Sequence, residues 1–358
     1  MTYGVIMAGG QGTRFWPRSL ANRPKQFLKL FGDRTMIQMT VDRLGQLIPE
    51  ERCMVVTNVD YTGLVRDQLP GIKDDFIIGE PVARNTAPCI ASAAALLQRH
   101  DPDAVMVVLP ADHRIADEET FRSVLASAIS TANEEKTLVT IGIEPDRPET
   151  GYGYIRYNQE KSRSRKEHSA FPVLGFTEKP DREKAISFLD QGGYLWNSGM
   201  FVWRADSILE AFRKHQPEIW SELEKWTGES VTRSEIDRFY QNCPSVSVDY
   251  GIMEQADNVQ VLPAEFGWND VGSWRAVYDL AEKDADGNAV MNTNVTIQES
   301  QNSYISTTGK RHVALVGVEN VAVVETEKGL LICDLDRVQE VKEVVERLRR
   351  EEGGDEWL

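Results

Sequence analysis

The sequence predicts an α/β protein with a helix-covered, largely parallel sheet, followed by a smaller β-rich C-terminal part. Two observations support this prediction. Over the first 145 residues, short apolar runs typical of buried strands alternate with amphipathic runs typical of helices. After a turn-rich junction at residues 283–288, short β segments follow one another and one helical pattern ends the chain. We place a boundary near residue 285, which gives domains 1–285 and 286–358.

The N-terminal elements are expected in regular alternation. We expect strands at residues 3–8, 53–57, 76–78, 104–109 and 138–143, and helices at 36–48, 87–100 and 121–132. The run at 104–109 is apolar throughout, as expected of a strand buried on both faces. Pro88 lies in the first turn of its helix, where its missing N–H costs little.

The rest of the chain is less regular. Strands are expected at 152–157, 171–176 and 194–203, a helix at 181–189, and two or three helices over 207–241 with interruptions at Pro217 and Gly228. The charged segment 158–170 reads as a solvated hairpin tip. Beyond residue 285 we expect β segments at 290–305, 312–318, 321–326 and 329–333, a helix over 338–348, and a frayed tail at 351–358.

Composition restricts the classes of function. The chain has 358 residues and a net charge of −16, so general binding of nucleic acid is not expected. Four scattered cysteines, without Cys-x-x-Cys or clustered His, indicate buried thiols rather than disulfides or a zinc site. Without a signal peptide or a membrane-length apolar run, we expect a cytoplasmic protein. The first thirty residues carry five cations and no acid, which points to an anionic ligand there.

The segment Gly9-Gly10-Gln11-Gly12-Thr13-Arg14 directly follows the first strand. It lacks the ending of a P-loop and the spacing of a dinucleotide-binding loop. It is either a tight turn or, with the cations of Arg14 and Lys25, a loop that binds a triphosphate through backbone N–H groups. Lys25 follows Pro24 and is our candidate catalytic cation; the alternative is a surface lysine.

Two aspartates are candidate Mg²⁺ ligands. Asp112 follows the buried strand at 104–109, and ligands bind at the carboxyl ends of strands in open α/β sheets. Asp270 lies between Trp268 and Trp274 in a Gly-containing loop. Each aspartate has an alternative role as the cap of a following helix, and sequence spacing cannot pair them. His113 is either a ligand or a hydrogen-bonded structural residue.

Further polar clusters suggest contacts to a sugar phosphate. Glu178 and Lys179 end a predicted strand with an acid and a base side by side, and Asn197 supplies an amide on an apolar strand. The segments 150–154 and 248–254 are either binding loops or turns. Each of these signals is weak alone.

In this order along the chain, the motifs resemble those of the bacterial mannose-1-phosphate guanylyltransferases, also called GDP-mannose pyrophosphorylases. The resemblance spans nearly the whole chain. Its motifs are GGQGTRFWP (9–17), PKQF (24–27), EPVARNTAP (80–88), PADH (110–113), FTEKP (176–180), WNSGMF (196–201), VDYGIME (248–254) and WNDVGSW (268–274).

The resemblance implies a Rossmann-like, GT-A-like nucleotidyltransferase domain with a mixed sheet, and a small C-terminal left-handed β-helix-like domain. It implies that GTP and α-mannose 1-phosphate give GDP-mannose and pyrophosphate, with Mg²⁺ as cofactor and a homodimer as the common assembly. Arg14 and Lys25 would be catalytic, and Asp112 and Asp270 would hold the metal. The nucleotide would be bound by Ala8, Gly9, Gly10, Gly12, Thr13, Arg14, Lys25, Glu80, Asn85, Thr86 and Asp112. The sugar phosphate would be bound by Gly153, Glu178, Lys179, Asn197 and Asp249.

Glu80 bears on the choice of base. Relatives that use pyrimidine triphosphates tend to have Gln at the equivalent position. Guanine presents two donors on one edge, which a carboxylate accepts together better than an amide does. We therefore predict that Glu80 contributes to guanine recognition.

The chain departs from the family pattern at Gln11, Phe15 and Ala83, which leaves the shape of the base pocket open. It also stops soon after its C-terminal helix, so isomerase activity is not expected. Two alternatives are an enzyme for another hexose 1-phosphate and a non-catalytic sensor of GDP-mannose. A sensor should have lost Arg14, Lys25, Asp112 or Asp270, yet all four are present.

Overall fold

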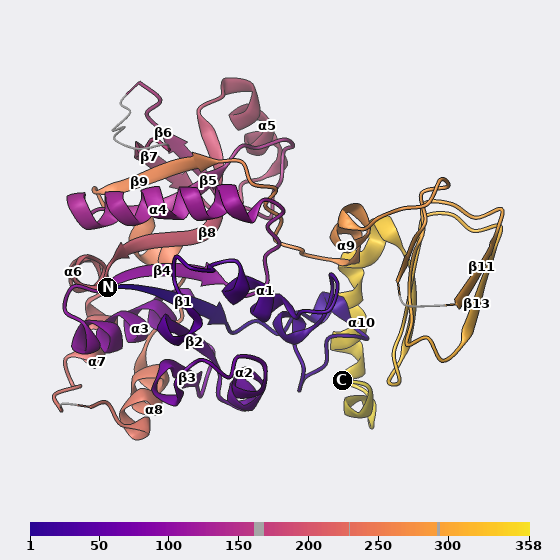
Figure 1. The fold of residues 1–358 in the computed structure, drawn as a ribbon, viewed down its shortest axis with the longest axis horizontal. Coiled ribbons are helices and arrows are strands. Elements are labelled where there is room, and N and C mark those ends of the chain that lie inside the picture. The colour runs from indigo at the N-terminus through magenta and orange to yellow at the C-terminus, as the bar shows by residue number, and fades with distance from the viewer. Residues whose placement is uncertain (161–167, 229, 292–293) are drawn as a thin grey trace. The chain divides into compact units, whose positions relative to one another are not determined.

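A computed structural model describes residues 1–160, 168–228, 230–291 and 294–358 (Figure 1). The chain forms two units, each assembled from separate stretches of sequence. The first consists of Met1–Gly9, Gln38–Ala111 and Ile115–Trp268, and the second of Gly10–Ile37, Asp112–Arg114 and Asn269–Leu358. We call residues 9–14 the glycine-rich loop. The grouping by contacts differs from a single cut near residue 285, because this loop from Gly10 onward and Asp112 group with the C-terminal stretch.

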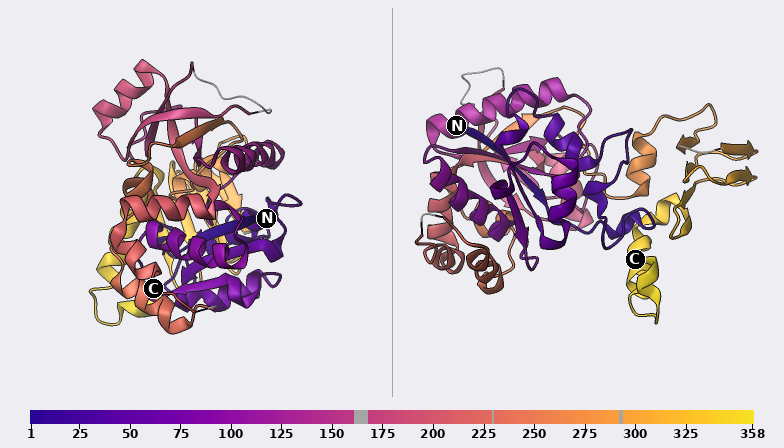
Figure 2. Two further views of the ribbon diagram at one scale, coloured as in Figure 1. Left: turned by 90° about the vertical axis from the view of Figure 1, so that its left-hand side faces the viewer. Right: turned by 60° about the horizontal axis from the view of Figure 1, so that its bottom comes forward.

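The first unit is built on a nine-stranded mixed sheet with the strand order β3-β2-β1-β4-β8-β5-β9-β7-β6. Helices flank both faces of the sheet (Figure 2). The strands are β1 (Thr2–Ala8), β2 (Cys53–Asn58), β3 (Ile77–Glu80), β4 (Val105–Pro110), β5 (Leu138–Ile143), β6 (Tyr154–Tyr157), β7 (Phe171–Thr177), β8 (Tyr194–Arg204) and β9 (Val259–Ala264).

The strands that carry the predicted site lie in the parallel part of this sheet. β1 pairs in parallel with β2 and with β4, whereas β8 is antiparallel to β4. Residues 105–109 of β4 are all buried, which confirms the strand covered on both faces that its apolar run predicts. Since β1 and β4 run in parallel, their carboxyl ends lie at the same edge of the sheet.

Apart from α2 (Thr62–Gln68), which lies in a polar stretch where no helix is expected, the helices of the first unit follow the predicted order with differences in length. They are α1 (Met36–Asp42), which begins in the second unit, α2 (Thr62–Gln68), α3 (Thr86–His100), α4 (Glu118–Glu135), α5 (Arg182–Gln191), α6 (Ala205–His215), α7 (Pro217–Leu223) and α8 (Arg233–Asn242). Two or three helices are expected over 207–241, and the described residues of that range form three, α6, α7 and α8. The helix expected over 36–48 ends at Asp42, and Gly45 beyond it has a φ of +52°. No helix of the described part has the length and apolar character that a bilayer crossing requires.

The hairpin expected around residues 158–170 is partly described. Its flanking strands β6 and β7 pair antiparallel, as a hairpin requires. Residues 161–167 lie outside the described residues, so the solvated tip remains an expectation.

The second unit carries stacked short strands. Its four-stranded sheet has the order β10-β12-β14-β15, and β11 pairs with β13. Pairs β10–β12, β12–β14 and β11–β13 are parallel, and Val318 and Val321 donate to serines 18 residues earlier in the chain. Parallel strands that stack with such a repeat form a β-helix-like coil. The strands are β10 (Ala289–Met291), β11 (Asn294–Gln298), β12 (Tyr304–Ser306), β13 (His312–Val316), β14 (Val321–Glu325) and β15 (Leu330–Asp334).

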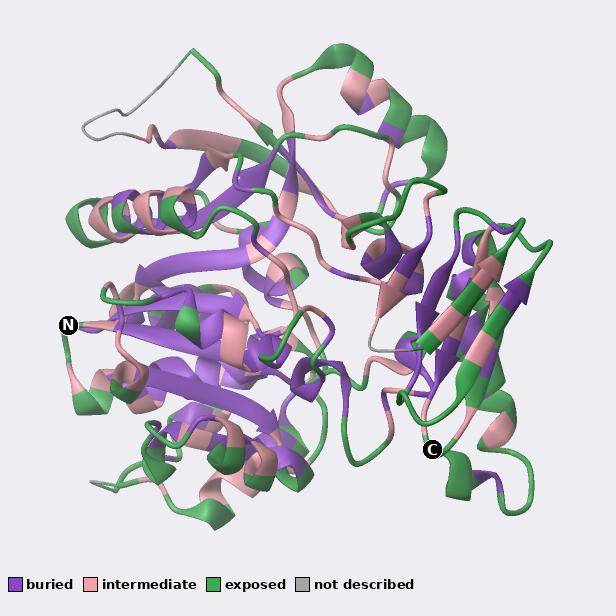
Figure 3. Ribbon diagram, turned by 45° about the vertical axis from the view of Figure 1, so that its right-hand side comes forward, coloured by how far each residue is buried: buried purple, intermediate pink, exposed green. Residues whose placement is uncertain are grey.

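Burial distinguishes the two small sheets. The middle strand β12 is fully buried, whereas β11 alternates exposed and half-buried residues (Figure 3). We call the stretch Gly10–Ile37 of this unit the N-terminal loop. Phe15 and Trp16 of this loop pack in one core with Trp274 of α9 (Trp274–Leu280). The same core contains Val341 and Val345 of α10 (Val341–Leu348). The N-terminal loop and the C-terminal helix therefore share one hydrophobic core.

The expectation of a frayed C-terminal tail is wrong. The indole Nε1 of Trp16 donates to the carbonyl of Trp357 over 2.9 Å, and the N–H of Ala21 donates to the Leu358 carbonyl over 2.7 Å. A 3₁₀ turn at Gly354–Trp357 brings these carbonyls to the N-terminal loop. Hydrogen bonds across more than 300 residues of sequence thus hold a tail that looks disordered in composition.

Candidate active site

A cavity of about 320 Å³ lies within the second unit and contains most of the predicted phosphate and metal residues. We call it the carboxylate cavity. Its lining residues are Gly12, Thr13, Arg14, Phe15, Lys25, Asp112, His113, Asp270, Val271, Gly272 and Lys342. Cations, backbone groups and two carboxylates therefore meet in one space, as a bound polyphosphate with a metal would require.

The glycine-rich loop passes very close to Lys25. Gly12 has a φ of +61°, and a Cβ atom placed on it would lie 2.4 Å from the Cβ of Lys25. Only glycine fits such an approach with such a backbone. The Gln26 amide Nε2 donates to the Gly10 carbonyl over 3.0 Å, which fixes the start of the loop. A 3₁₀ turn at Thr13–Phe15 then places Arg14 at the cavity.

Lys25 is a buried cation and not a surface lysine. Its residue is 4% exposed, and its Nζ donates to Asp112 Oδ2 and to the backbone carbonyl of Asp270, each over 2.8 Å. Nζ also lies 5.4 Å from the centre of the Phe15 ring. A single ammonium thus ties together both segments that carry the predicted metal ligands.

A short backbone bridge brings the two aspartates into the same cavity. The N–H of Arg114 donates to the Asn269 carbonyl over 2.8 Å, and the N–H of Asn269 donates to the Arg114 carbonyl over 3.0 Å. Neither aspartate caps the helix that follows it. Asp117 caps α4, and Ser273 stands at the N-cap position of α9. The capping alternatives are therefore excluded.

The electrostatics of Asp112 favour the carboxylate form. Burial raises its pKa, but the Lys25 ammonium and the neighbouring His113 lower it more, so the pKa lies below its usual value. Asp112 Oδ1 is 4.0 Å from His113 Nε2. An ionised carboxylate is the form that a metal ion requires.

The residues present fit a Mg²⁺ ion whose remaining ligands would be substrate phosphates and water. Within the described ranges, no three His, Cys, Asp or Glu side chains converge to hold a metal by themselves. Mg²⁺ is commonly bound by one or two carboxylates together with phosphates and water, so the pair Asp112 and Asp270 suffices as a protein contribution.

Glu80 is a buried polar residue of the first unit and does not line the carboxylate cavity. Its residue is 7% exposed, and among the described residues its Oε1 has no hydrogen-bond partner. Burial raises its pKa to about 7, although the Tyr240 hydroxyl counteracts this rise. A Cβ atom on Gly9 would lie 3.2 Å from Glu80 Oε2, so the glycine leaves room beside this carboxyl. A buried acceptor without a partner is costly unless a ligand satisfies it.

The neighbours of Glu80 have structural roles that sequence reasoning did not assign. Asn85 has a φ of +65° and caps α3, and the Thr86 hydroxyl accepts from the Val248 N–H over 2.9 Å. The Ala8 carbonyl accepts from the Thr57 hydroxyl over 2.8 Å. These groups therefore shape the end of the sheet.

All five predicted sugar-phosphate residues come together in the first unit. The Asn197 N–H donates to the Gly153 carbonyl over 2.8 Å, and its Nδ2 donates to Asp249 Oδ1 over 2.7 Å. Lys179 Nζ donates to Glu178 Oε1 over 2.6 Å, and Lys179 has a φ of +46°. A Cβ atom on Gly153 would lie 2.4 Å from Glu178 Oε2. We call these five residues the sugar cluster.

The sugar cluster holds two acids close together. Burial and the nearby charge of Glu178 raise the pKa of Asp249 to about 6, against the hydrogen bond from Asn197. The hydrogen bond to Glu178 raises the pKa of Lys179. The two carboxylates and the amide oxygen can accept hydrogen bonds from sugar hydroxyls, and the ammonium can donate to a phosphate.

Known proteins are similar to this chain in sequence and in fold. Residues 3–287 match the family described as nucleotidyl transferase, and residues 292–348 match the MannoseP isomerase/GMP-like beta-helix domain. Mannose-1-phosphate guanylyltransferase of Escherichia coli K12 is 42% identical over 97% of this chain and 73% of its own length. The alginate biosynthesis protein AlgA of Pseudomonas aeruginosa PAO1 is 40% identical over 96% and 71%, respectively.

A solved structure agrees over almost the whole chain. The Thermus thermophilus protein described as mannose-1-phosphate geranyltransferase matches with a TM-score of 0.86 and 33% identity. The match covers 97% of this chain and 99% of that one. The chain therefore belongs to the nucleotidyl transferase family and, within it, to the mannose-1-phosphate guanylyltransferases.

Proposed function

We propose that this enzyme makes GDP-mannose and pyrophosphate from GTP and α-mannose 1-phosphate. A phosphate oxygen of the sugar phosphate attacks the α-phosphorus of GTP in line. The new oxygen–phosphorus bond forms as the bond to the β-phosphate oxygen breaks, and pyrophosphate leaves with that electron pair. No general base is required because the attacking phosphate is already an anion near neutral pH. Positioning and charge neutralisation are then the tasks of the protein.

The carboxylate cavity is the proposed site of phosphate chemistry. The observation that carries the proposal is the buried Lys25, whose Nζ holds Asp112 and the Asp270 backbone in the cavity of the glycine-rich loop. Backbone N–H groups of Gly9, Gly10, Gly12 and Thr13 bind phosphate oxygens, and Arg14 and Lys25 stabilise the charge of the transition state. Asp112 and Asp270 would hold Mg²⁺, which when bound supplies further positive charge to the phosphates.

The base and the sugar phosphate are assigned to the first unit. The unpartnered Oε1 of Glu80 supports a role in accepting from guanine, with Ala8, Asn85 and Thr86 beside the nucleotide. The sugar cluster supports binding of mannose 1-phosphate, since its amide and carboxylates match hydroxyl groups and its ammonium matches a phosphate.

A matrix of the purified enzyme with four nucleoside triphosphates and several hexose 1-phosphates tests the activity. We expect Mg²⁺-dependent release of pyrophosphate to be fastest with GTP and mannose 1-phosphate. No release from this pair would refute the proposal, and faster release with another hexose 1-phosphate would reassign the sugar.

The metal assignment is tested by replacing single carboxylates. Asp112→Asn and Asp270→Asn should each lower kcat by about 10²-fold or more while folding normally. Asp117→Asn is the matched control, because Asp117 only caps α4. Retained activity in either of the first two variants would remove that residue from the metal site.

Three further proposals concern the whole chain. The domain boundary near residue 285 is supported by the two family matches, which end at 287 and begin at 292. A cytoplasmic location agrees with the free and buried Cys53, Cys89 and Cys243. A homodimer is supported by the exposed apolar Val316 and Ile332 in the C-terminal strands, and light scattering would test it.

A further inference from the structure

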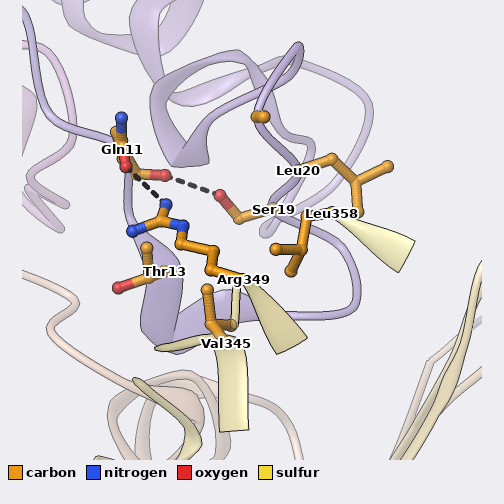
Figure 4. Close-up of a pocket in the computed structure, with 8 residues that line it drawn as sticks. Gln11, Thr13, Ser19, Leu20, Val345, Arg349 and Leu358 are labelled. Carbon is orange, nitrogen blue, oxygen red and sulfur yellow. Dashed lines mark hydrogen bonds between the residues drawn. The ribbon is translucent and has the colours of Figure 1, made fainter. Parts of the chain in front are cut away.

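One face of the C-terminal helix α10 lies along the glycine-rich loop. Lys342, in its first turn, lines the carboxylate cavity. Val345, three residues later, is 3% exposed and packs in the core that contains Phe15. Arg349, directly after the helix, donates from Nη2 to Gln11 Oε1 over 2.8 Å (Figure 4). Residues spaced by three and four share one side of a helix, so one face supplies all three contacts.

Among the cations of the carboxylate cavity, Lys25 and Arg14 have hydrogen-bond partners, whereas Lys342 differs from them. Among the described residues, no hydrogen bond or ion pair involves its ammonium, whereas Arg347 on the same helix pairs with Glu351. Lys25 neutralises Asp112, and Arg14 Nη1 reaches the Gly272 carbonyl over 3.4 Å. The two carboxylates of the cavity offset much of its positive charge. Part of the negative charge of a bound polyphosphate would therefore remain without a neutralising cation.

We propose that Lys342 binds the terminal phosphates of the nucleotide and the pyrophosphate that leaves. This inference rests on the proposed function and deepens it. A lysine ammonium is a point charge on a flexible stem, which suits terminal phosphates that must be held and then released. The exposed position of Lys342 gives it that freedom, and the Val345 and Arg349 contacts keep the helix beside the loop. The C-terminal domain thereby contributes a substrate-binding residue.

Binding of pyrophosphate to the whole enzyme tests the inference directly. Isothermal titration calorimetry in the presence of Mg²⁺ would compare the wild type with Lys342→Met. We expect the dissociation constant to rise about tenfold, as for the loss of one charge-assisted hydrogen bond to a partly solvated anion. Lys342→Arg should keep most of the affinity, because it restores the charge.

Arg347→Met provides the matched control. It removes one positive charge from the same helix, but its partner is Glu351 and it does not line the cavity. We expect its pyrophosphate affinity to stay within about twofold of the wild type, since solvent screens distant charges. In steady-state assays, Lys342→Met should raise the KM for GTP and leave the KM for mannose 1-phosphate unchanged.

The outcomes separate this inference from the proposed function. Equal weakening in the Lys342→Met and Arg347→Met variants, wild-type affinity in Lys342→Met, or no pyrophosphate binding by the wild type would each overturn the role of Lys342. A wild type that binds pyrophosphate but releases none from GTP and mannose 1-phosphate would refute the function. In that case the selective loss in Lys342→Met would still support the phosphate contact. Thermal unfolding of each variant checks that the fold is intact.

Discussion

Replacing Glu80 by glutamine should stabilise the protein at neutral and alkaline pH, and much less in acid. The change keeps the shape of the side chain and removes a buried titratable group. Burial raises the pKa of Glu80 from 4.5 to about 7. A rise of this size corresponds to ~3 kcal/mol of free energy against the ionised form in the folded protein.

The direction of the effect with pH follows from the two protonation states. Below pH 4.5 the carboxyl is protonated in both the folded and the unfolded chain, and burial carries no charge penalty. Between pH 4.5 and about 7 the unfolded chain ionises first, so the folded wild type loses stability as pH rises. Above about pH 7 the full penalty remains. Glu80→Gln has no such penalty, so its advantage should grow by ~3 kcal/mol over this range.

Urea unfolding of both proteins near pH 4.5 and near pH 8 measures this change. The pKa of Asp249 is also raised, to about 6, but Asp249 is present in both proteins and cancels in the comparison. If the difference in unfolding free energy between the two proteins were the same at both pH values, the burial penalty on the ionised Glu80 carboxyl would be refuted.

The same variant tests the role of Glu80 in choosing the base. An ionised carboxylate accepts from both donors of guanine, so the KM of the wild type for GTP should fall as pH rises through about 7. Glu80→Gln should lose that dependence and part of its preference for GTP over ATP and UTP in kcat/KM. An unchanged preference would show that another residue reads the base.

Three other substitutions have direct expectations. Lys25→Met should lower kcat by about 10²- to 10³-fold, because its Nζ holds Asp112 and the Asp270 backbone; a loss below about tenfold in single-turnover assays would remove it from the chemistry. Asn197→Ala removes the 2.7 Å hydrogen bond to Asp249 and should raise the KM for mannose 1-phosphate about tenfold with the KM for GTP unchanged; equal rises in both would contradict a sugar-specific role. Deleting residues 354–358 removes the bonds to Trp16 and Ala21 and should lower Tm by a few degrees, which calorimetry would detect; an unchanged Tm would mean that the tail frays in solution.

The sequence predicts the elements whose signals are local. The uninterrupted apolar run of β4 and the Pro88 start of α3 both identify their elements correctly. The sequence does not predict β9, because Gln260 and Pro263 interrupt its apolar pattern; the strand forms through its pairing with β5. The sequence does not predict α2 either, because its residues are mostly polar and only Val65 is buried.

The pairing of the site residues depends on backbone contacts that side-chain patterns do not encode. Asp112 and Asp270 share a cavity because Arg114 and Asn269 exchange backbone hydrogen bonds, and almost any residue can form such bonds. The sequence does not mark Lys342 as a cavity residue, apart from its spacing from Val345 and Arg349. That spacing becomes informative only once the glycine-rich loop is known to lie beside the helix.

The C-terminal strands support the glycine-rich loop through a chain of aromatic contacts. Phe15, next to Arg14, packs edge-on against Trp274 with ring centres 5.1 Å apart, and Trp274 stacks on Tyr304 of β12 at 5.7 Å. The Trp274 indole also donates to the Trp16 carbonyl over 3.2 Å. A loop rich in glycine has little conformational preference of its own, so its shape must come from what it packs against. Because that surface includes α9, β12 and α10, the β-helix-like part acts as a scaffold for the glycine-rich loop as well as the source of Lys342.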